Sequence, residues 1–298
     1  MTLKQLEAFY WAATCASFAV AADRLHLSLS SLSKRIAELE SALGLDLFDR
    51  SGHRAVLTAA GERLLPQARD LLASADRIRA SLRAEPELGV RCRFGVGELS
   101  ALTWLPRLIG RVRGRYPGLA LEPYVDVGQV LKRKVAEGEL DFAVVAGASS
   151  HSAIASAPVG QAHFAWVAAP SVAGAAQSLT PQLLAGTALV SLPDGAGTTR
   201  LLDPWLAGGA PAGPRLACNN WGAIAGMLLE GMGIGLLPRH WAQALARDGA
   251  LRILASDPDP VPLHYAFHWR RDDTRPLVAA MRDQVLLSVD FAAPCRLP

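Results

Sequence analysis

Residues 24–57 decide the fold of the first part of this chain, and they read RLHLSLSSLSKRIAELESALGLDLFDRSGHRAVL. Ser28 suits the N-cap of a helix, because its hydroxyl can accept a hydrogen bond from a free amide of the first turn. Gly44 suits the other end of that helix, where a left-handed backbone is common. Between these ends, apolar residues recur at spacings of four, three and four and predict one buried helix face: Leu32, Ile36, Leu39 and Leu43.

The opposite face of this predicted helix carries small hydroxyls and cations. Hydroxyls at a helix start, with cations one turn later, are typical of a helix that enters the major groove of DNA. A hairpin predicted over residues 45–57 adds two arginines around a turn at Ser51-Gly52. Each of these side chains alone would suit an ordinary solvated face, but together they favour DNA binding. The candidate DNA contacts are Ser28, Ser31, Ser33, Lys34, Arg35, Arg50 and Arg54.

Two further helices are predicted before this stretch, with Thr2 and Ser17 as their N-caps. Ala21 and Ala22 point inward on the second of them and are small enough for two helices to approach closely. Three short helices followed by a hairpin indicate a winged helix-turn-helix. The net charge of the whole chain is only +3, so DNA binding would depend on where the cations lie and not on bulk charge.

A long helix is predicted after the hairpin, with Thr58 as its N-cap. Its apolar residues recur at alternating spacings of four and three, which is a heptad seam, and the residues between them are largely polar. A seam this narrow favours pairing with a second copy of the helix, and an ordinary core helix is the alternative. The segment 84–89 then ends the helix and forms a hinge. The seam consists of Leu64, Ala68, Leu71, Ala75, Ile78 and Leu82.

The rest of the chain alternates strands and helices and predicts an α/β fold with a largely parallel sheet. Predicted strands cover residues 91–96, 119–125 and 142–145, with helices between them, and the pattern repeats beyond residue 163. Two such lobes in series imply a cleft between them. Ligands of open α/β sheets bind beyond the carboxyl ends of the strands.

The loops at those strand ends supply the candidate contacts to a small ligand. Glu98 is the residue most able to set the charge of that ligand, because an ionised carboxylate facing the cleft would favour an amine or a polyol. Capping of its own helix start is the alternative for Glu98, and caps or turns are the alternative for the hydroxyls and the amide. The candidates are Glu98, Ser100, Thr103, Gly128, Thr198 and Asn219.

Catalytic, metal and cofactor motifs are missing from the sequence. Its four cysteines form no Cys-x-x-Cys pair, which argues against a metal site and suits a reducing cytoplasm. His264 and His268 have a metal-like spacing, but the apolar residues alternating around them indicate a strand. There is no P-loop and no nucleophile elbow, and no apolar run is long enough for a membrane span. We therefore expect a protein without enzymatic activity, bound metal, cofactor or membrane association.

Residues 1–65 resemble the LysR-type transcriptional regulators. The positions that carry this resemblance are Phe9, Ser17-Phe18, Ala21-Ala22, Leu25, Ser28, Leu32-Ser33, Ile36, Leu39-Glu40, Gly44, Leu47-Phe48, Arg50-Ser51, Leu57-Thr58, Gly61-Glu62 and Leu64-Leu65. In the C-terminal part, GELDFAV at 138–144, GMGIGLLP at 231–238 and Leu105-Pro106 are similar to motifs of the family's effector domain. One position departs from the family: Leu29 stands where a Gln commonly reaches a base edge, so only apolar contact with DNA is available there.

The resemblance implies an N-terminal winged helix-turn-helix (1–58), a linker and dimerisation helix with its hinge (59–88), and a two-lobed effector domain (89–298) similar to periplasmic binding proteins. Lobe one would comprise residues 89–160 and 269–298, and lobe two residues 161–268. The implied partners are a double-stranded DNA operator, a small polar effector, and further copies of the chain as a homodimer or homotetramer. A ligand-binding or interaction module without operator recognition is the alternative, and Leu29-Ser30 is its support.

Overall fold

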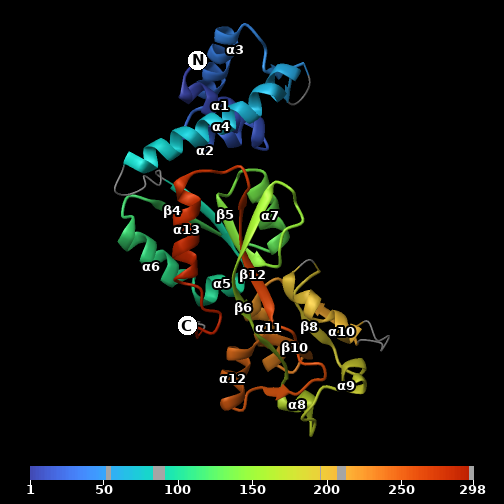
Figure 1. Cartoon of the computed structure of the whole chain (residues 1–298). Helices are drawn as coiled ribbons and strands as arrows, with labels where there is room; N and C mark the ends of the chain where they lie inside the picture. The colour runs from blue at the N-terminus through green and yellow to red at the C-terminus, as the bar shows by residue number, and fades with distance from the viewer. Residues whose placement is uncertain (52–54, 83–90, 195, 207–212, 295–298) are drawn as a thin grey trace.

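A computed structural model describes residues 1–51, 55–82, 91–194, 196–206 and 213–294. Figure 1 shows an N-terminal domain, drawn in blue, stacked on one end of a two-lobed body, with the long helix α4 running along the N-terminal domain. The elements of the N-terminal domain are α1 (Leu3–Thr14), α2 (Phe18–Arg24), α3 (Leu29–Leu43), β1 (Phe48–Asp49), β2 (Val56–Leu57) and α4 (Ala59–Leu82). This order confirms the predicted winged helix-turn-helix and linker helix.

The predicted caps define the helix ends of this domain. The side chains of Thr2, Ser17 and Ser28 each accept a hydrogen bond from a backbone amide in the first turn of the helix that follows. Gly44 ends α3 with φ of 65°, the left-handed conformation that glycine adopts without strain. Each cap thus satisfies one of the amides that have no partner within the helix.

One apolar core holds α1, α2, α3 and the start of α4 together. Leu32, Ile36 and Leu39 of α3 are fully buried in it, as predicted, whereas Leu43 lies at the exposed end of the helix. The helix α4 begins directly against the base of the hairpin, because Gly61 has no side chain. A Cβ atom at Gly61 would lie 2.3 Å from the carbonyl oxygen of Leu47. The hairpin and the linker helix are therefore packed as one unit.

Lobe one is a five-stranded sheet in the order β4-β3-β5-β12-β6. The strands β3, β4 and β5 are parallel, as predicted, while β12 runs antiparallel to both β5 and β6. In Figure 1, α6 and α13 lie on one side of this sheet and α7 on the other. The elements are β3 (Arg91–Val96), α5 (Glu98–Thr103), α6 (Leu105–Arg115), β4 (Ala120–Val125), α7 (Gly128–Ala136), β5 (Phe142–Ala146), β6 (Ile154–Ala162), β12 (Leu263–Arg270) and α13 (Pro276–Leu286).

Lobe two is a second five-stranded sheet, in the order β11-β7-β10-β8-β9. Here β8, β9 and β10 are parallel, and β7 is antiparallel to β10 and β11. The elements are β7 (Phe164–Ala168), α8 (Pro170–Ala173), α9 (Pro181–Ala185), β8 (Leu189–Ser191), the 3-10 helix η1 (Gly197–Leu201), α10 (Asp203–Leu206), β9 (Arg215–Ala217), α11 (Trp221–Leu229), β10 (Ile234–Pro238), α12 (Arg239–Arg247) and β11 (Arg252–Leu254).

The return of the chain from lobe two to lobe one differs from the expected boundary. The resemblance implied a return at Trp269, but the whole of β12 from Leu263 pairs with β5 and β6 in the sheet of lobe one. A strand already paired along both edges belongs to the sheet that holds its hydrogen bonds. His264 and His268 lie on this strand, as the alternating pattern predicted. In the described ranges, every helix is too short or too polar to cross a membrane.

Candidate functional site

The start of α3 presents an exposed polar edge in the N-terminal domain. Ser28, Leu29 and Ser31 are exposed there, and the Leu29 side chain is 52% exposed. The Ser28 Oγ accepts a hydrogen bond from the Ser31 amide at 3.1 Å, and it lies 2.8 Å from the Ser31 Oγ. Lys34 is exposed one turn later. This edge joins hydroxyls, an apolar side chain and a cation on the end of one helix, which suits contact with base edges in a major groove.

The other candidate DNA contacts lie around this edge. Ser33 and Arg35 are half-buried on α3. Arg50 follows β1, and its guanidinium forms an ion pair with Glu40 at 3.0 Å. The second Glu40 oxygen accepts hydrogen bonds from the backbone amides of Leu47 and Phe48. Glu40 therefore fixes the hairpin to α3. Arg54 lies outside the described residues. No spacing or cap in the sequence indicated the pairing of Arg50 with Glu40.

A cavity of about 520 Å³ lies between the two lobes. A volume of this size suits a small molecule. Its walls come from segments that follow strands in both lobes, as the rule for open α/β sheets predicts. These segments are 97–99, 125–129, 145–146, 196–200 and 219–221, with Lys132, Leu192, Leu263 and Tyr265 beside them.

Glu98 links the two lobes across this cavity. It is the first residue of α5 in lobe one, yet its carboxylate accepts hydrogen bonds from lobe two. The donors are the Asn220 Nδ2 and the Trp221 amide, each at 2.8 Å. Burial raises the pKa of Glu98, and the Trp221 amide opposes that shift. Glu98 therefore caps a helix, but that helix is α11 of the facing lobe and not its own.

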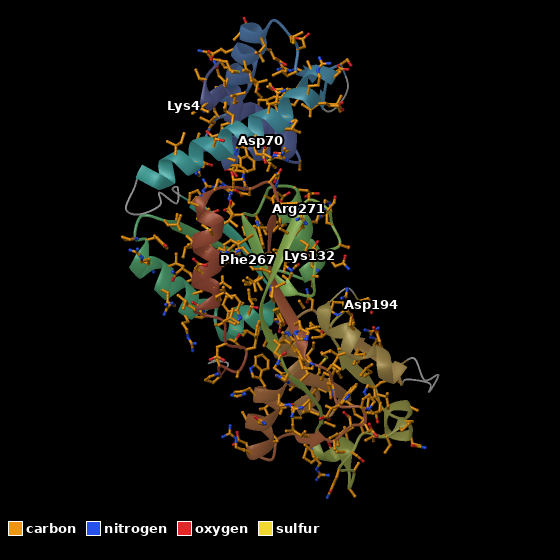
Figure 2. The ribbon with its side chains drawn as sticks, in the orientation of Figure 1. Lys4, Asp70, Lys132, Asp194, Phe267 and Arg271 are labelled. Carbon is orange, nitrogen blue, oxygen red and sulfur yellow. The ribbon has the colours of Figure 1, made fainter. Side chains whose placement is uncertain are left out.

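Two cations face the same cavity, one from each lobe. Lys132 of α7 donates to the Ala148 carbonyl at 3.2 Å, and Arg200 of η1 lies on the lobe-two wall. Burial, and then the charge of Arg200, lower the pKa of Lys132. Figure 2 shows Lys132 on lobe one and Asp194 on lobe two, near the junction of the lobes. Neither cation was identified from the sequence. Lys132 belongs to a run of basic residues in which no spacing shows which side chain points toward the cavity.

Four of the six predicted effector contacts line the cavity: Glu98, Gly128, Thr198 and Asn219. Ser100 and Thr103 are not among its lining residues. Ser100 is fully buried, and the Thr103 hydroxyl donates to the Leu99 carbonyl of its own helix at 2.6 Å. Their role as effector contacts stays a prediction that the arrangement does not favour.

The linker seam on α4 is divided between two environments. Leu71 and Ile78 are 47% and 61% exposed, whereas Leu64 and Ala75 are half-buried. Ala68 is buried in the core of its own domain, where α4 crosses α1, which differs from its expected place on the seam. Leu82 ends the helix. The exposed part of the seam thus lies along the outer half of α4, beyond the N-terminal core.

In the part of the chain that the structure describes, no group of three or more His, Cys, Asp or Glu side chains is placed to hold a metal ion. The strand that carries the two histidines leaves His264 exposed and His268 buried. The His268 Nδ1 lies 2.9 Å from the Ser156 hydroxyl. These histidines belong to the strand and its packing.

Comparison with known proteins matches both parts of the chain to family models. Residues 3–62 match the bacterial regulatory helix-turn-helix protein, lysR family, and residues 87–288 match the LysR substrate binding domain. The chain is 29% identical over 272 residues to the uncharacterized HTH-type transcriptional regulator YeiE of Escherichia coli strain K12, covering 91% of this chain and 90% of that protein.

Two further similarities differ in extent. A probable RuBisCO transcriptional regulator of Cyanophora paradoxa is 34% identical over 151 residues, which spans 50% of this chain and 47% of that protein. The structure of a full-length OxyR variant from Pseudomonas aeruginosa superposes with a TM-score of 0.66 at 24% identity, covering 100% of this chain and 99% of that one. At this identity the superposition shows a shared fold.

Proposed function

Since the chain belongs to the LysR family of bacterial DNA-binding transcriptional regulators, we propose that a small polar effector binds in the cavity between its lobes and modulates its action on an operator. The winged helix-turn-helix supplies the DNA contacts through the exposed edge of α3. The effector domain supplies the cavity. We assign no catalytic step to either part. The regulator would act in the cytoplasm, where bacterial DNA lies.

The observation that carries this proposal is the charge pattern of the cavity. Lys132 and Arg200 supply cations, Glu98 supplies a carboxylate that accepts hydrogen bonds from the facing lobe, and Asp126 supplies a second carboxylate, which accepts a hydrogen bond from the Val127 amide. Hydrogen bonds to charged groups in a confined site are stronger than neutral ones. The effector we infer carries an anionic group for Lys132 and Arg200, and a donor group that can compete for Glu98.

Such an effector would alter the spacing of the lobes. If a donor group of the effector binds the Glu98 carboxylate, the hydrogen bonds that Asn220 and Trp221 donate to Glu98 are exchanged for bonds from the ligand. A ligand shifts a conformational equilibrium only by its difference in affinity between the two states. Replacing a direct link between the lobes by a link through the ligand provides that difference.

Calorimetric titration of the full chain with small acids, amines, amino acids and sugars tests the proposal. For any anionic compound that binds, Lys132→Met should weaken binding by roughly ten- to a hundredfold, the cost of one charged hydrogen bond. Lys134→Met is the matched control, since Lys134 lies on the same helix but pairs with Glu139 and does not line the cavity. No binding by any compound, or equal losses in both variants, would contradict the assignment.

A further inference from the structure

The N-terminal domain packs against lobe one of the same chain through a cluster of buried charges around one tryptophan. We propose that this cluster docks the DNA-binding domain onto lobe one as a single rigid body, so that lobe one positions the recognition helix α3. We call it the interdomain cluster. Its members are Trp11 and Arg24 from the N-terminal domain and Asp141, Arg270, Asp273 and Arg275 from lobe one.

Trp11 of α1 lies at the centre of the interdomain cluster and is 5% exposed. The guanidinium carbon of Arg24, from its own domain, lies 4.2 Å from the ring centre. Those of Arg270 and Arg275, from lobe one, each lie 5.4 Å away. A guanidinium over an indole face within about 6 Å is attracted to the ring, and more strongly where water is excluded. Arginines from both domains therefore bind the same ring.

Ion pairs close the interdomain cluster around the tryptophan. Arg24 contacts Asp273 at 2.7 Å and Asp141 at 3.3 Å, and all three side chains are less than a tenth exposed. Arg275 pairs with the same two carboxylates, each at 2.6 Å. Two arginines thus balance these two aspartates, while Arg270 pairs with Asp272. Removing Arg24 would leave two buried carboxylates facing one cation, and an uncompensated buried charge is strongly destabilising.

The Asp273 carboxylate of the interdomain cluster stays ionised at neutral pH. Burial alone would raise the pKa of Asp273, but Arg275 and then Arg24 lower it to about 2. The attraction across the interface is therefore not lost under cellular conditions. It depends on Arg24, which is the cation that the DNA-binding domain contributes to the carboxylates.

Direct hydrogen bonds join the two domains around this cluster. The Ala16 amide donates to the Glu137 carbonyl at 3.0 Å, and Arg24 donates to the Gly138 carbonyl at 2.7 Å. In the opposite direction, Arg270 donates to the Thr14 carbonyl at 2.8 Å. Backbone groups that pair across an interface define its geometry more narrowly than long side chains at a surface do. The contact has the character of a docked interface.

Three strands of lobe one connect this interface with the cavity. The strand β5 begins after Asp141 and reaches the cavity at Val145, while β12 leaves the cavity at Tyr265 and ends at Arg270. Figure 2 places Arg271, just beyond β12, at the end of lobe one that faces the N-terminal domain. The third strand, β3, carries Arg93, which pairs with Asp23 of α2, and leads into the cavity wall.

Each of these strands spans only about 13–17 Å between the interface and the cavity. They lie side by side in one hydrogen-bonded sheet, which has little freedom to bend. A displacement of lobe one would therefore carry the docked domain with it. This last step rests on the function proposed above, whereas the docking itself does not.

Hydrogen exchange on the full chain without ligand tests the docking. Arg24→Met should speed exchange in the peptide that contains Ala16 by at least about tenfold, because the amide loses the protection of the interface. Arg107→Met is the matched control, since Arg107 is an exposed arginine of lobe one whose contact with Asp290 lies outside the interdomain cluster. The protection of α3 amides, measured in the same experiment, shows whether the N-terminal domain is still folded.

A second variant keeps the test decisive if Arg24→Met unfolds the domain. Asp273→Asn removes the partner from the lobe-one side and should also speed exchange around Ala16 while α3 stays protected. The Tm losses of the two variants should combine to less than their sum, whereas those of Arg24→Met and Arg107→Met should add. Unchanged exchange around Ala16 in a folded variant, or additive losses for the Arg24 and Asp273 pair, would overturn the docking whether or not an effector is ever found.

Discussion

Replacing Glu98 by Gln should loosen the contact between the two lobes. The Glu98 carboxylate accepts two hydrogen bonds from lobe two, from the Asn220 Nδ2 and the Trp221 amide. The two donors approach different oxygens of the Glu98 carboxylate, Oε1 and Oε2, and a Gln side chain places an NH2 group at one of these two positions. Asn220 cannot simply rotate its amide, because its Oδ1 already accepts the Ala223 amide and caps α11. In the observed geometry, the donor that faces the Gln NH2 group therefore loses its acceptor.

The magnitude follows from these bonds. A hydrogen bond to a charged group contributes about 1.5–3 kcal/mol, and partial exposure of Glu98 argues for the lower end of that range. A loss near 1.5 kcal/mol corresponds to a roughly tenfold shift in the opening equilibrium of the lobes. Burial raises the pKa of Glu98 and the Trp221 amide opposes that shift, as expected for a carboxylate that is only partly shielded from water.

Hydrogen exchange of the peptide that contains Trp221 measures this opening. We expect about tenfold faster exchange in Glu98→Gln than in the wild-type chain, in line with the free energy above. Glu230→Gln is the control, because Glu230 is an exposed residue at the other end of α11. Equal exchange of the Trp221 peptide in the wild-type chain and Glu98→Gln would refute the idea that Glu98 holds the lobes together.

Three further predictions concern other parts of the chain. Burial, and then Lys132, lower the pKa of His268 from 6.5 to about 4, so the stability that its neutral form provides is present above pH 6.5 and lost toward pH 4. Unfolding measured against pH should therefore show a slope of about 1.4 kcal/mol per pH unit in that window that His268→Phe lacks. Leu71→Asp, on the exposed part of the α4 seam, should dissociate the oligomer in light scattering, at a cost of several kcal/mol; an unchanged mass would exclude pairing there. Lys34→Ala should lower the salt slope of binding to any duplex by about one unit, and an unchanged slope would remove Lys34 from the DNA contacts.

The N-terminal domain could be predicted almost completely from sequence, because its signals are local. Caps at Ser28 and Gly44 and the apolar spacing of α3 each depend on residues within one or two turns. Lobe two and lobe one were also predicted as α/β units, since strands and helices alternate visibly. The place of β12 was predicted less well, because its two neighbours in the sheet lie more than 100 residues earlier in the chain.

The interdomain cluster gives no signal in the sequence. Trp11 and Arg24 lie some 250 residues from Arg270 and Asp273, and no periodic pattern relates positions so far apart. Glu98 illustrates a related limit: its position at a helix start predicted a local cap, but it caps the helix of the facing lobe. Contacts between domains depend on the relative placement of folded units, which local propensity does not encode.

Selection of duplex DNA from a random-sequence library by the purified full chain tests the central claim most directly. A LysR-type regulator that reads DNA through the edge of α3 and pairs through α4 should enrich one dyad-symmetric sequence, because the two-fold axis of a dimer is matched in its operator. Lys34→Ala should weaken that enrichment. If the wild-type chain enriches no sequence, operator recognition is contradicted, and the chain would be a ligand-binding module in which Leu29 has replaced a base contact.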